Sequence, residues 1–268
     1  MTTEIDTNEP VLLVEQHDAV RLLTLNRPSV RNALNTDLIH RLRTAIADAD
    51  ADDRVDVVVL TGSGDAFCAG LDLRQLGGTG ANAEHISADT IPVGHPWTPI
   101  RKPVIGAVNG PAITGGLEIA LACDFLIASD RARFADTHSR VGVLPGWGLT
   151  TRLPEAVGAG FARRMSMTGD FVDAAGALRV GLVTEVVPHD ELVPTTLRVA
   201  FAVAQNDQQG LRTLLASYRR AHAHIIDPAL AAENATSVAW MRGFDPATVA
   251  ERRASIVERG RDQNKDVQ

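Results

Sequence analysis

The stretch GGLEIALAC at residues 115–123 decides most about the fold and function of this 268-residue chain. A helix over these residues is apolar on every side except at Glu118, so we predict that it is buried. Glutamate is rarely buried without a partner or a purpose, which makes Glu118 a candidate proton donor or acceptor. If Gly115 is the N-cap, however, Glu118 takes the third helical position, where a carboxylate can simply cap backbone N–H groups. The residues alone leave both roles open.

Two glycine-containing turns are the next feature, and each follows an apolar segment that we predict to be a strand. FCAGLD at residues 67–72 follows the strand expected at residues 55–60, and AITGG at residues 112–116 follows the one expected at residues 103–108. Backbone N–H groups at two such strand-to-helix junctions can form an oxyanion hole. Glycine turns are common, so a plain chain reversal is the alternative.

His138 lies in DTHSR at residues 136–140. Its imidazole could act as a neutral base, as a hydrogen-bonding acid or as a phosphate contact, although an isolated histidine is more often structural. His222 and His224 are predicted to be solvated helix residues. The chain has no zinc-protease motif, Walker loop or nucleophilic-serine elbow, and the glycines at 77–80 lack the flanking strand and helix of a dinucleotide site.

Composition and charge exclude several classes of protein. Hydrophobic residues make up 45% and charged residues 22%, as in a globular α/β protein with a sizeable core. A net charge of −7 argues against nucleic acid as a partner. The two cysteines have no metal-ligand spacing, so we expect no metal site and a reduced, cytoplasmic setting. The polar, acidic N-terminus is unlike a secretory signal, and no apolar stretch is long enough to span a membrane.

Strand and helix patterns alternate along most of the chain. Further elements predicted from periodicity are strands at residues 11–16, 20–26, 125–128 and 181–187, and helices at residues 35–49 and 246–258. Residues 76–98 are rich in glycine and proline and are predicted to be an irregular lid or binding loop. From about residue 192 the composition predicts several helices. The chain is therefore expected to have an α/β core followed by a helical region.

Taken in order, these segments resemble the crotonase (enoyl-CoA hydratase/isomerase) superfamily over nearly the whole chain. The segments that carry the resemblance are LNRP at 25–28, NAL at 32–34, FCAGLDL at 67–73, residues 103–109, residues 115–124, TGD at 168–170 and residues 174–187. Each is weak alone, but their order and spacing are specific. The resemblance implies a spiral of strand–strand–helix repeats over residues 1–195. It also implies a helical C-terminal region, residues 196–268, that forms trimers and closes the pocket.

The resemblance also implies a catalytic site. The backbone N–H groups of Leu71 and Gly115 would form an oxyanion hole that polarises a thioester carbonyl. In family hydratases two glutamates hold the water that adds across the C2–C3 double bond. One of them matches Glu118, and the other falls, counting without gaps, on His138. This change keeps a group that can transfer protons but alters its charge, reach and pKa.

Other positions are implied to contact the substrate or its coenzyme A (CoA) part: Arg27, Ala69, Asp72, Arg74, Gly116 and Trp147. Arg74 falls where the family often has a basic residue near the CoA phosphates, and a solvated surface arginine is the alternative. Asp65 stands where a basic residue is common, which weakens the phosphate contact. The segment 141–148 has no carboxylate, so the dehalogenase branch is not expected, and Trp147 is predicted to line the pocket or to join the core.

The resulting expectation is an enoyl-CoA hydratase-like lyase that needs no cofactor, because CoA is part of the substrate. We expect a homotrimer or a dimer of trimers, with no nucleic-acid or membrane partner. One alternative is an enoyl-CoA isomerase or another enolate-forming enzyme in which Glu118 shuttles the proton alone. Another is a weakly active or inactive acyl-CoA-binding homologue, favoured by His138. A purely structural trimer-forming protein is a third.

Overall fold

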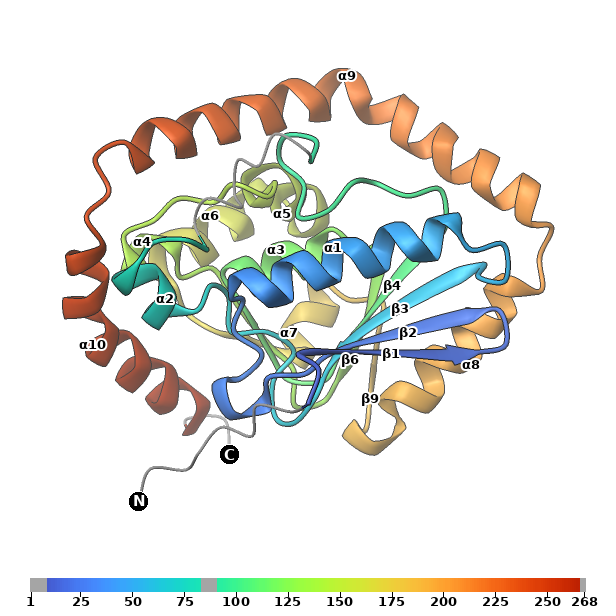
Figure 1. Ribbon diagram of the computed structural model, residues 1–268, viewed down its shortest axis with the longest axis horizontal. Coiled ribbons are helices and arrows are strands. Elements are labelled where there is room, and N and C mark those ends of the chain that lie inside the picture. The colour runs from blue at the N-terminus through green and yellow to red at the C-terminus, as the bar shows by residue number, and fades with distance from the viewer. Residues whose placement is uncertain (1–8, 83–90, 266–268) are drawn as a thin grey trace.

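The computed structural model describes residues 9–82 and 91–265, and its strands form two sheets (Figure 1). The larger sheet has six strands in the order β1-β2-β3-β4-β6-β9, and the smaller has three in the order β5-β7-β8. All neighbours are parallel except the β1/β2 and β7/β8 pairs. The strands are β1 (Leu12–His17), β2 (Val20–Leu25), β3 (Val57–Gly62), β4 (Val104–Val108), β5 (Pro111–Ile113), β6 (Phe125–Ser129), β7 (Arg133–Ala135), β8 (Val172–Asp173) and β9 (Glu185–Val187).

The helices surround these sheets, and the last of them extend away from the body (Figure 1). They are α1 (Thr36–Ala51), α2 (Leu73–Gly78), α3 (Gly115–Leu121), α4 (His138–Val141), α5 (Leu149–Val157), α6 (Ala159–Thr168), α7 (Ala174–Arg179), α8 (Leu192–Ala204), α9 (Gln208–Met241) and α10 (Pro246–Lys265). Short 3-10 helices span Pro28–Val30 and His189–Glu191. Among the described residues no helix is both long and apolar enough to cross a membrane.

A strand–strand–helix unit repeats along the core. β4, β5 and α3 form one unit, and β6, β7 and α4 form the next. Within the larger sheet β4 pairs with β6, and within the smaller sheet β5 pairs with β7. A parallel bridge between Cys68 and Ala112 places the segment after β3 beside β5 in the same way. The units therefore stack into the spiral that the resemblance implied.

The central strands are buried on both faces, as their continuous apolar sequences predict. All residues of β4 and all but the last of β3 are buried. α1 covers one face of the larger sheet and α8 covers the other (Figure 1), and the apolar side chains beneath them form two separate clusters. This packing makes the strand ends after β3 and β4 rigid supports for the turns that follow them.

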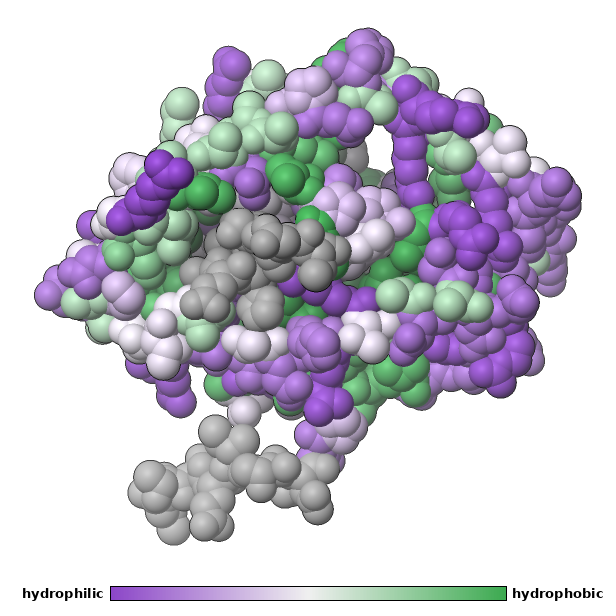
Figure 2. Space-filling model, turned by 45° about the horizontal axis from the view of Figure 1, so that its top comes forward, coloured by the Kyte–Doolittle hydropathy of each residue, from purple (hydrophilic) through white to green (hydrophobic). Residues whose placement is uncertain are grey.

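The C-terminal region is helical, as predicted. α9 runs as an arch over the molecule with Pro228 inside it, and α10 returns along α2 (Figure 1). Figure 2 shows an opening between the arch and the body. The cleft beneath the arch is lined by α9 residues such as Tyr218 and Ile226, and by core residues such as Trp97 and Phe125.

Some boundaries differ from the predictions. The strand expected at residues 181–187 is ordered as a strand only from residue 185, and the one expected at 55–60 runs over 57–62. The segment expected to be irregular from residue 76 begins inside α2, because the Asp72 side chain accepts the N–H of Arg74 and caps that helix. Within the irregular segment, residues 83–90 lie outside the described residues, as do residues 1–8 of the predicted polar N-terminus.

Gly116 is required by close packing between two repeats. A Cβ at this position would overlap the carbonyl oxygen of Cys68, which is buried backbone and cannot move aside. We expect Gly116→Ala to lower the free energy of unfolding by at least about 3 kcal/mol, measured by urea denaturation. Gly160→Ala is the control, because its Cβ would meet open space on α6 and should stabilise the helix by about 0.5 to 1 kcal/mol. Equal stability of the two variants would contradict this packing.

Candidate active site

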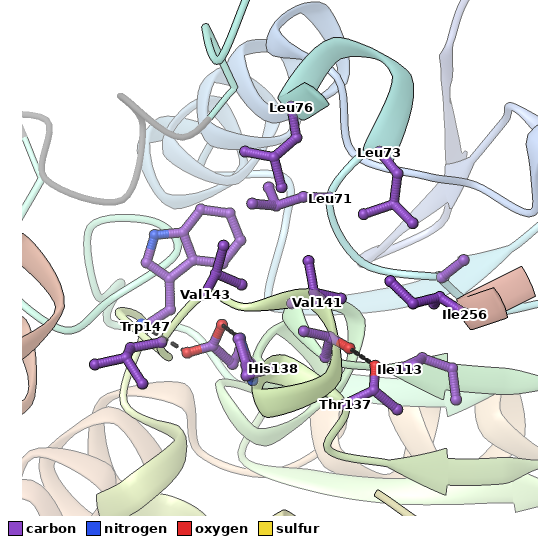
Figure 3. A pocket seen from close by; sticks show the side chains of 15 residues that line it. Leu71, Leu73, Leu76, Ile113, Thr137, His138, Val141, Val143, Trp147 and Ile256 are labelled. Atoms are coloured by element: carbon purple, nitrogen blue, oxygen red, sulfur yellow. Dashed lines mark hydrogen bonds and ion pairs between the residues drawn. The ribbon is translucent and has the colours of Figure 1, made fainter. Parts of the chain in front are cut away.

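A cavity opens between the turns after β3 and β5, the loop 143–147 and helix α10 (Figure 3). Its volume is about 600 Å³ when its open mouth is included. The lining residues are Ala69, Leu71, Leu73, Leu76, Ile113, Thr114, Gly115, Glu118, Thr137, His138, Val141, Val143, Leu144, Trp147 and Ile256. Glu118 and His138 are the ionisable members of this lining, so the cavity combines apolar walls with one charged centre.

The N–H groups of Leu71 and Gly115 lie side by side in this cavity. In the bridge between Leu34 and Leu71, the N–H of Leu34 donates to Gly70 and its C=O accepts from Asp72, so the Leu71 N–H points away from Leu34. Gly115 begins α3, where a backbone N–H has no partner within the helix. A Cβ on Gly115 would lie 3.8 Å from the Leu71 nitrogen. Within residues 9–82 and 91–265 neither N–H donates to a protein acceptor.

Gly70 and Asn32 bring these two N–H groups together. Gly70 has φ +86°, and a Cβ there would lie 2.8 Å from the Ile113 carbonyl oxygen, so the approach of the two turns needs glycine. The buried Asn32 side chain donates to the carbonyl groups of Ser63 and Ala66 at 2.9 and 2.8 Å. These bonds hold the chain between β3 and the Leu71 turn, which explains why the motif carries an asparagine.

Glu118 is buried, with 4% of its surface exposed, and both of its carboxylate oxygens have partners. Oε1 accepts the N–H groups of Gly146 at 3.1 Å and Trp147 at 2.7 Å. Oε2 lies 3.3 Å from Nε2 of His138. The N-cap of α3 is Thr114, one residue before the predicted position. The alternative that Glu118 only caps its own helix is therefore wrong, because the carboxylate reaches across the cavity.

His138 lies between two carboxylates. Its Nδ1 is 2.6 Å from Oδ1 of Asp136, which also accepts the backbone N–H of His138 at 3.1 Å. Burial lowers the pKa of His138, but the hydrogen bonds and charges of Asp136 and Glu118 outweigh it and raise this pKa to about 10. For Asp136, burial raises the pKa of the carboxyl group. The hydrogen bonds from His138 and Ser166 and the charge of His138 have a larger, opposite effect, so the pKa of Asp136 is lowered overall. The raised pKa favours a protonated His138 at neutral pH, with Asp136 on one side of the ring and Glu118 on the other.

The remaining predicted contact residues have different placements. Trp147 is buried, and it lines the cavity next to Glu118, to which its backbone N–H donates. Ala69 also lines the cavity, where its side chain can make only apolar contacts. Arg27 and Asp72 pair with each other at 3.0 Å, and Arg27 also donates to a backbone carbonyl. This ion pair connects two chain segments. Arg74 is exposed on α2, between the lining residues Leu73 and Leu76, and is not itself part of the lining.

Sequence reasoning missed Glu233, a buried residue of α9. Its carboxylate accepts the N–H groups of Gly148 and Thr150, which continue the backbone that binds Glu118. Leu230, Glu233 and Ser237 are buried at helical spacing, a pattern visible in the sequence. The surface that this face contacts could not be deduced, because it lies about 85 residues earlier in the chain.

Comparisons with known proteins establish the family. The chain belongs to the enoyl-CoA hydratase/isomerase family, whose model matches residues 15–244. A crystal structure of an enoyl-CoA hydratase from Mycobacterium smegmatis is 52% identical with a TM-score of 0.79, over 88% of this chain and 100% of that one. A probable enoyl-CoA hydratase of Rhizobium meliloti is 42% identical over 72% of this chain and 75% of its own length. The crotonyl-CoA hydratase of Syntrophomonas wolfei is 35% identical over 83% and 86%.

The raised pKa of His138 predicts a pH dependence of stability. Its pKa is about 10 in the folded protein against an ordinary 6.5, so the folded state holds an extra proton. This stabilisation is complete below pH 6.5 and is lost as the pH rises through about 10. In Asp136→Asn one supporting carboxylate is gone, so we expect the loss across this window to shrink by on the order of 2 kcal/mol. Urea denaturation at several pH values measures it.

His138→Gln is the control for this experiment, since it removes the titrating group and should abolish the pH-dependent difference. Parallel stability curves for the wild type and Asp136→Asn between pH 6.5 and 10 would contradict the charge arrangement.

Proposed function

We propose that this protein is an enoyl-CoA hydratase, a lyase that adds water across the C2–C3 double bond of an enoyl-CoA thioester. The observation that carries the proposal is the placement of Glu118 and His138, in direct contact, in the same apolar cavity as the paired N–H groups of Leu71 and Gly115. The relatives named as hydratases cover most of this chain and of their own length, which supports the same reaction.

The thioester oxygen would bind between the N–H groups of Leu71 and Gly115. Addition of water at C3 moves electron density onto this oxygen and forms an enolate. Backbone dipoles that are already oriented in an apolar cavity stabilise such a charge more strongly than water does, because they need no reorganisation. The two N–H groups would therefore lower the barrier to attack of water on C3.

Two proton transfers complete the addition. Glu118 accepts a proton from the water whose oxygen bonds to C3. The imidazolium of His138 then gives a proton to C2, which converts the enolate to the 3-hydroxyacyl thioester. Afterwards the proton on Glu118 passes to His138 across their 3.3 Å contact, which restores both groups. Water is the only species added, and nothing is oxidised or reduced, so the proposed reaction needs no redox cofactor.

Glu118→Gln tests this assignment, because the amide cannot accept the proton of water. We expect the loss of enoyl absorbance with crotonyl-CoA to slow by at least about 100-fold, while binding of the CoA ester changes little. Incorporation of solvent oxygen, followed with ¹⁸O-labelled water, separates hydration from double-bond isomerisation. Retained turnover in the variant would contradict the role of Glu118. Product without ¹⁸O would indicate an isomerase, and binding without turnover in the wild type would indicate an acyl-CoA-binding homologue.

The cavity walls predict the kind of acyl group. The acyl chain would lie against side chains such as Leu76, Val143 and Ile256, and no lysine or arginine belongs to the described lining. A carboxylate at the end of the chain would lose its hydration without gaining a partner. We expect kcat/KM for apolar enoyl chains to exceed that for ω-carboxylated chains of equal length by at least about tenfold, since 1.4 kcal/mol suffices for this ratio. Comparable values for both would contradict an apolar acyl site.

A homotrimer, alone or paired into a hexamer, remains our prediction for the assembly. The cleft beneath α9 and exposed apolar side chains on that helix, such as Tyr218 and Ile225, offer surface that a second copy of the chain could cover. Light scattering coupled to size-exclusion chromatography measures the mass of this assembly.

Three further expectations also remain predictions. They are a cytoplasmic location, a contact between Arg74 and the CoA phosphates, and the absence of nucleic-acid and membrane partners.

A further inference from the structure

A short backbone segment, residues 146–150, lies between two buried carboxylates. On one side, Gly146 and Trp147 donate their N–H groups to Oε1 of Glu118. On the other, Gly148 and Thr150 donate theirs to a carboxylate from a distant part of the chain. Four N–H groups of one short segment are thus divided between two acids. The orientation of the first pair depends on how the second pair is held.

The second carboxylate belongs to Glu233 on α9, and 7% of that residue is exposed. Its Oε1 accepts the Gly148 N–H at 2.6 Å, and its Oε2 accepts the N–H and the hydroxyl of Thr150 at 2.6 and 2.5 Å. Burial, and then the charge of Glu118, raise the pKa of Glu233, while these bonds lower it. Three hydrogen-bond donors thus converge on this one buried side chain, and together they fix the backbone at Gly148 and Thr150 relative to α9.

Helix α5 explains why a distant acid is needed here. Its N-cap is Gly148, with φ +92° and no side chain to accept the free N–H groups of the first turn. Glu233 replaces the missing cap. Arg152 contributes a positive charge near both acids and donates to the carbonyl of Trp147. The segment is therefore bonded on its N–H and C=O sides, and it can present its first two N–H groups in a single direction.

We propose that Glu233 is a positioning residue for the reaction: it fixes residues 146–150 so that two N–H groups hold one oxygen of Glu118, which leaves the other directed at His138. This proposal rests on the proposed function of Glu118. It also gives the C-terminal region a part in catalysis, because α9 supplies a side chain to the support of the catalytic acid. Loss of the Glu233 bonds frees the segment and lets the Glu118 carboxylate rotate.

Glu233→Gln tests the proposal, because glutamine keeps the size of the side chain but replaces one acceptor oxygen with a donor. We expect kcat for crotonyl-CoA hydration to fall at least tenfold, whereas KM changes less than threefold. Glu233→Asp, which keeps the charge but is too short to reach both Gly148 and Thr150, should recover only part of kcat. It also serves as the second variant if Glu233→Gln does not fold.

Ser237→Ala is the matched control, since Ser237 lies one turn further along α9, is buried and donates to Leu144 at 3.4 Å. We expect its kcat to stay within twofold of the wild type. Unchanged kcat in a folded Glu233→Gln variant would overturn the proposal. So would a parallel change of kcat and KM, together with an equal loss in Ser237→Ala, because that pattern indicates general loosening of α9.

A second measurement does not require turnover, so it separates this proposal from the proposed function. The chain has 3 tryptophans, so ¹⁵N-tryptophan labelling gives three backbone amide signals in an NMR spectrum. Glu118→Gln identifies the Trp147 signal, because its N–H donates to Glu118. We expect Glu233→Gln to shift the same signal and Ser237→Ala to leave it in place. A Trp147 signal unaffected by Glu233→Gln would overturn the positioning role even if the wild type hydrates no substrate.

Discussion

The carboxyl group of Glu118 lies in a cavity whose walls are mostly apolar, and the rest of the site depends on keeping it hydrogen-bonded there. A buried carboxylate without partners would be neutralised or would disrupt its surroundings. Here two backbone N–H groups bind one oxygen, and an imidazolium faces the other. The loop after α4, the start of α5 and one face of α9 are all arranged by this requirement. The proposed catalytic group is thus also the group that these local hydrogen bonds hold in place.

Histidine at position 138 changes the electrostatics that two glutamates would produce. Two neighbouring carboxylates repel each other and share protons, whereas here a histidine lies between the carboxyl groups of Asp136 and Glu118 and bonds to both. This arrangement keeps a proton donor and a proton acceptor in contact, as the two successive proton transfers of the proposed reaction require. Asp136 does not line the cavity, but it contributes to the site because its hydrogen bond and charge stabilise the protonated form of His138. His138 is therefore not isolated in the site, because Asp136 stabilises its protonated form.

Much of the fold was predictable because it depends on local patterns. The apolar runs of β3, β4 and β6 and the periodicity of α1 follow directly from burial, and the structure confirms these elements. The order of the motifs was sufficient to indicate the spiral. The start of α2 and the shortened β9 were predicted less well. In both places a capping side chain or strand pairing decides the boundary, and neither is visible in a window of sequence.

Sequence alone was enough to indicate the family, to single out Glu118 and to suggest His138 for the second acid/base position. Those conclusions depend on residue identity and spacing, which the chain carries directly. Only the tertiary structure decided that Glu118 reaches His138 and the Gly146 and Trp147 amides, and that Glu233 supports that segment from α9. The reason is geometric. Contacts between residues about 20 to 85 positions apart depend on how the repeats stack and where the C-terminal helices return, and side-chain pattern does not encode those directions.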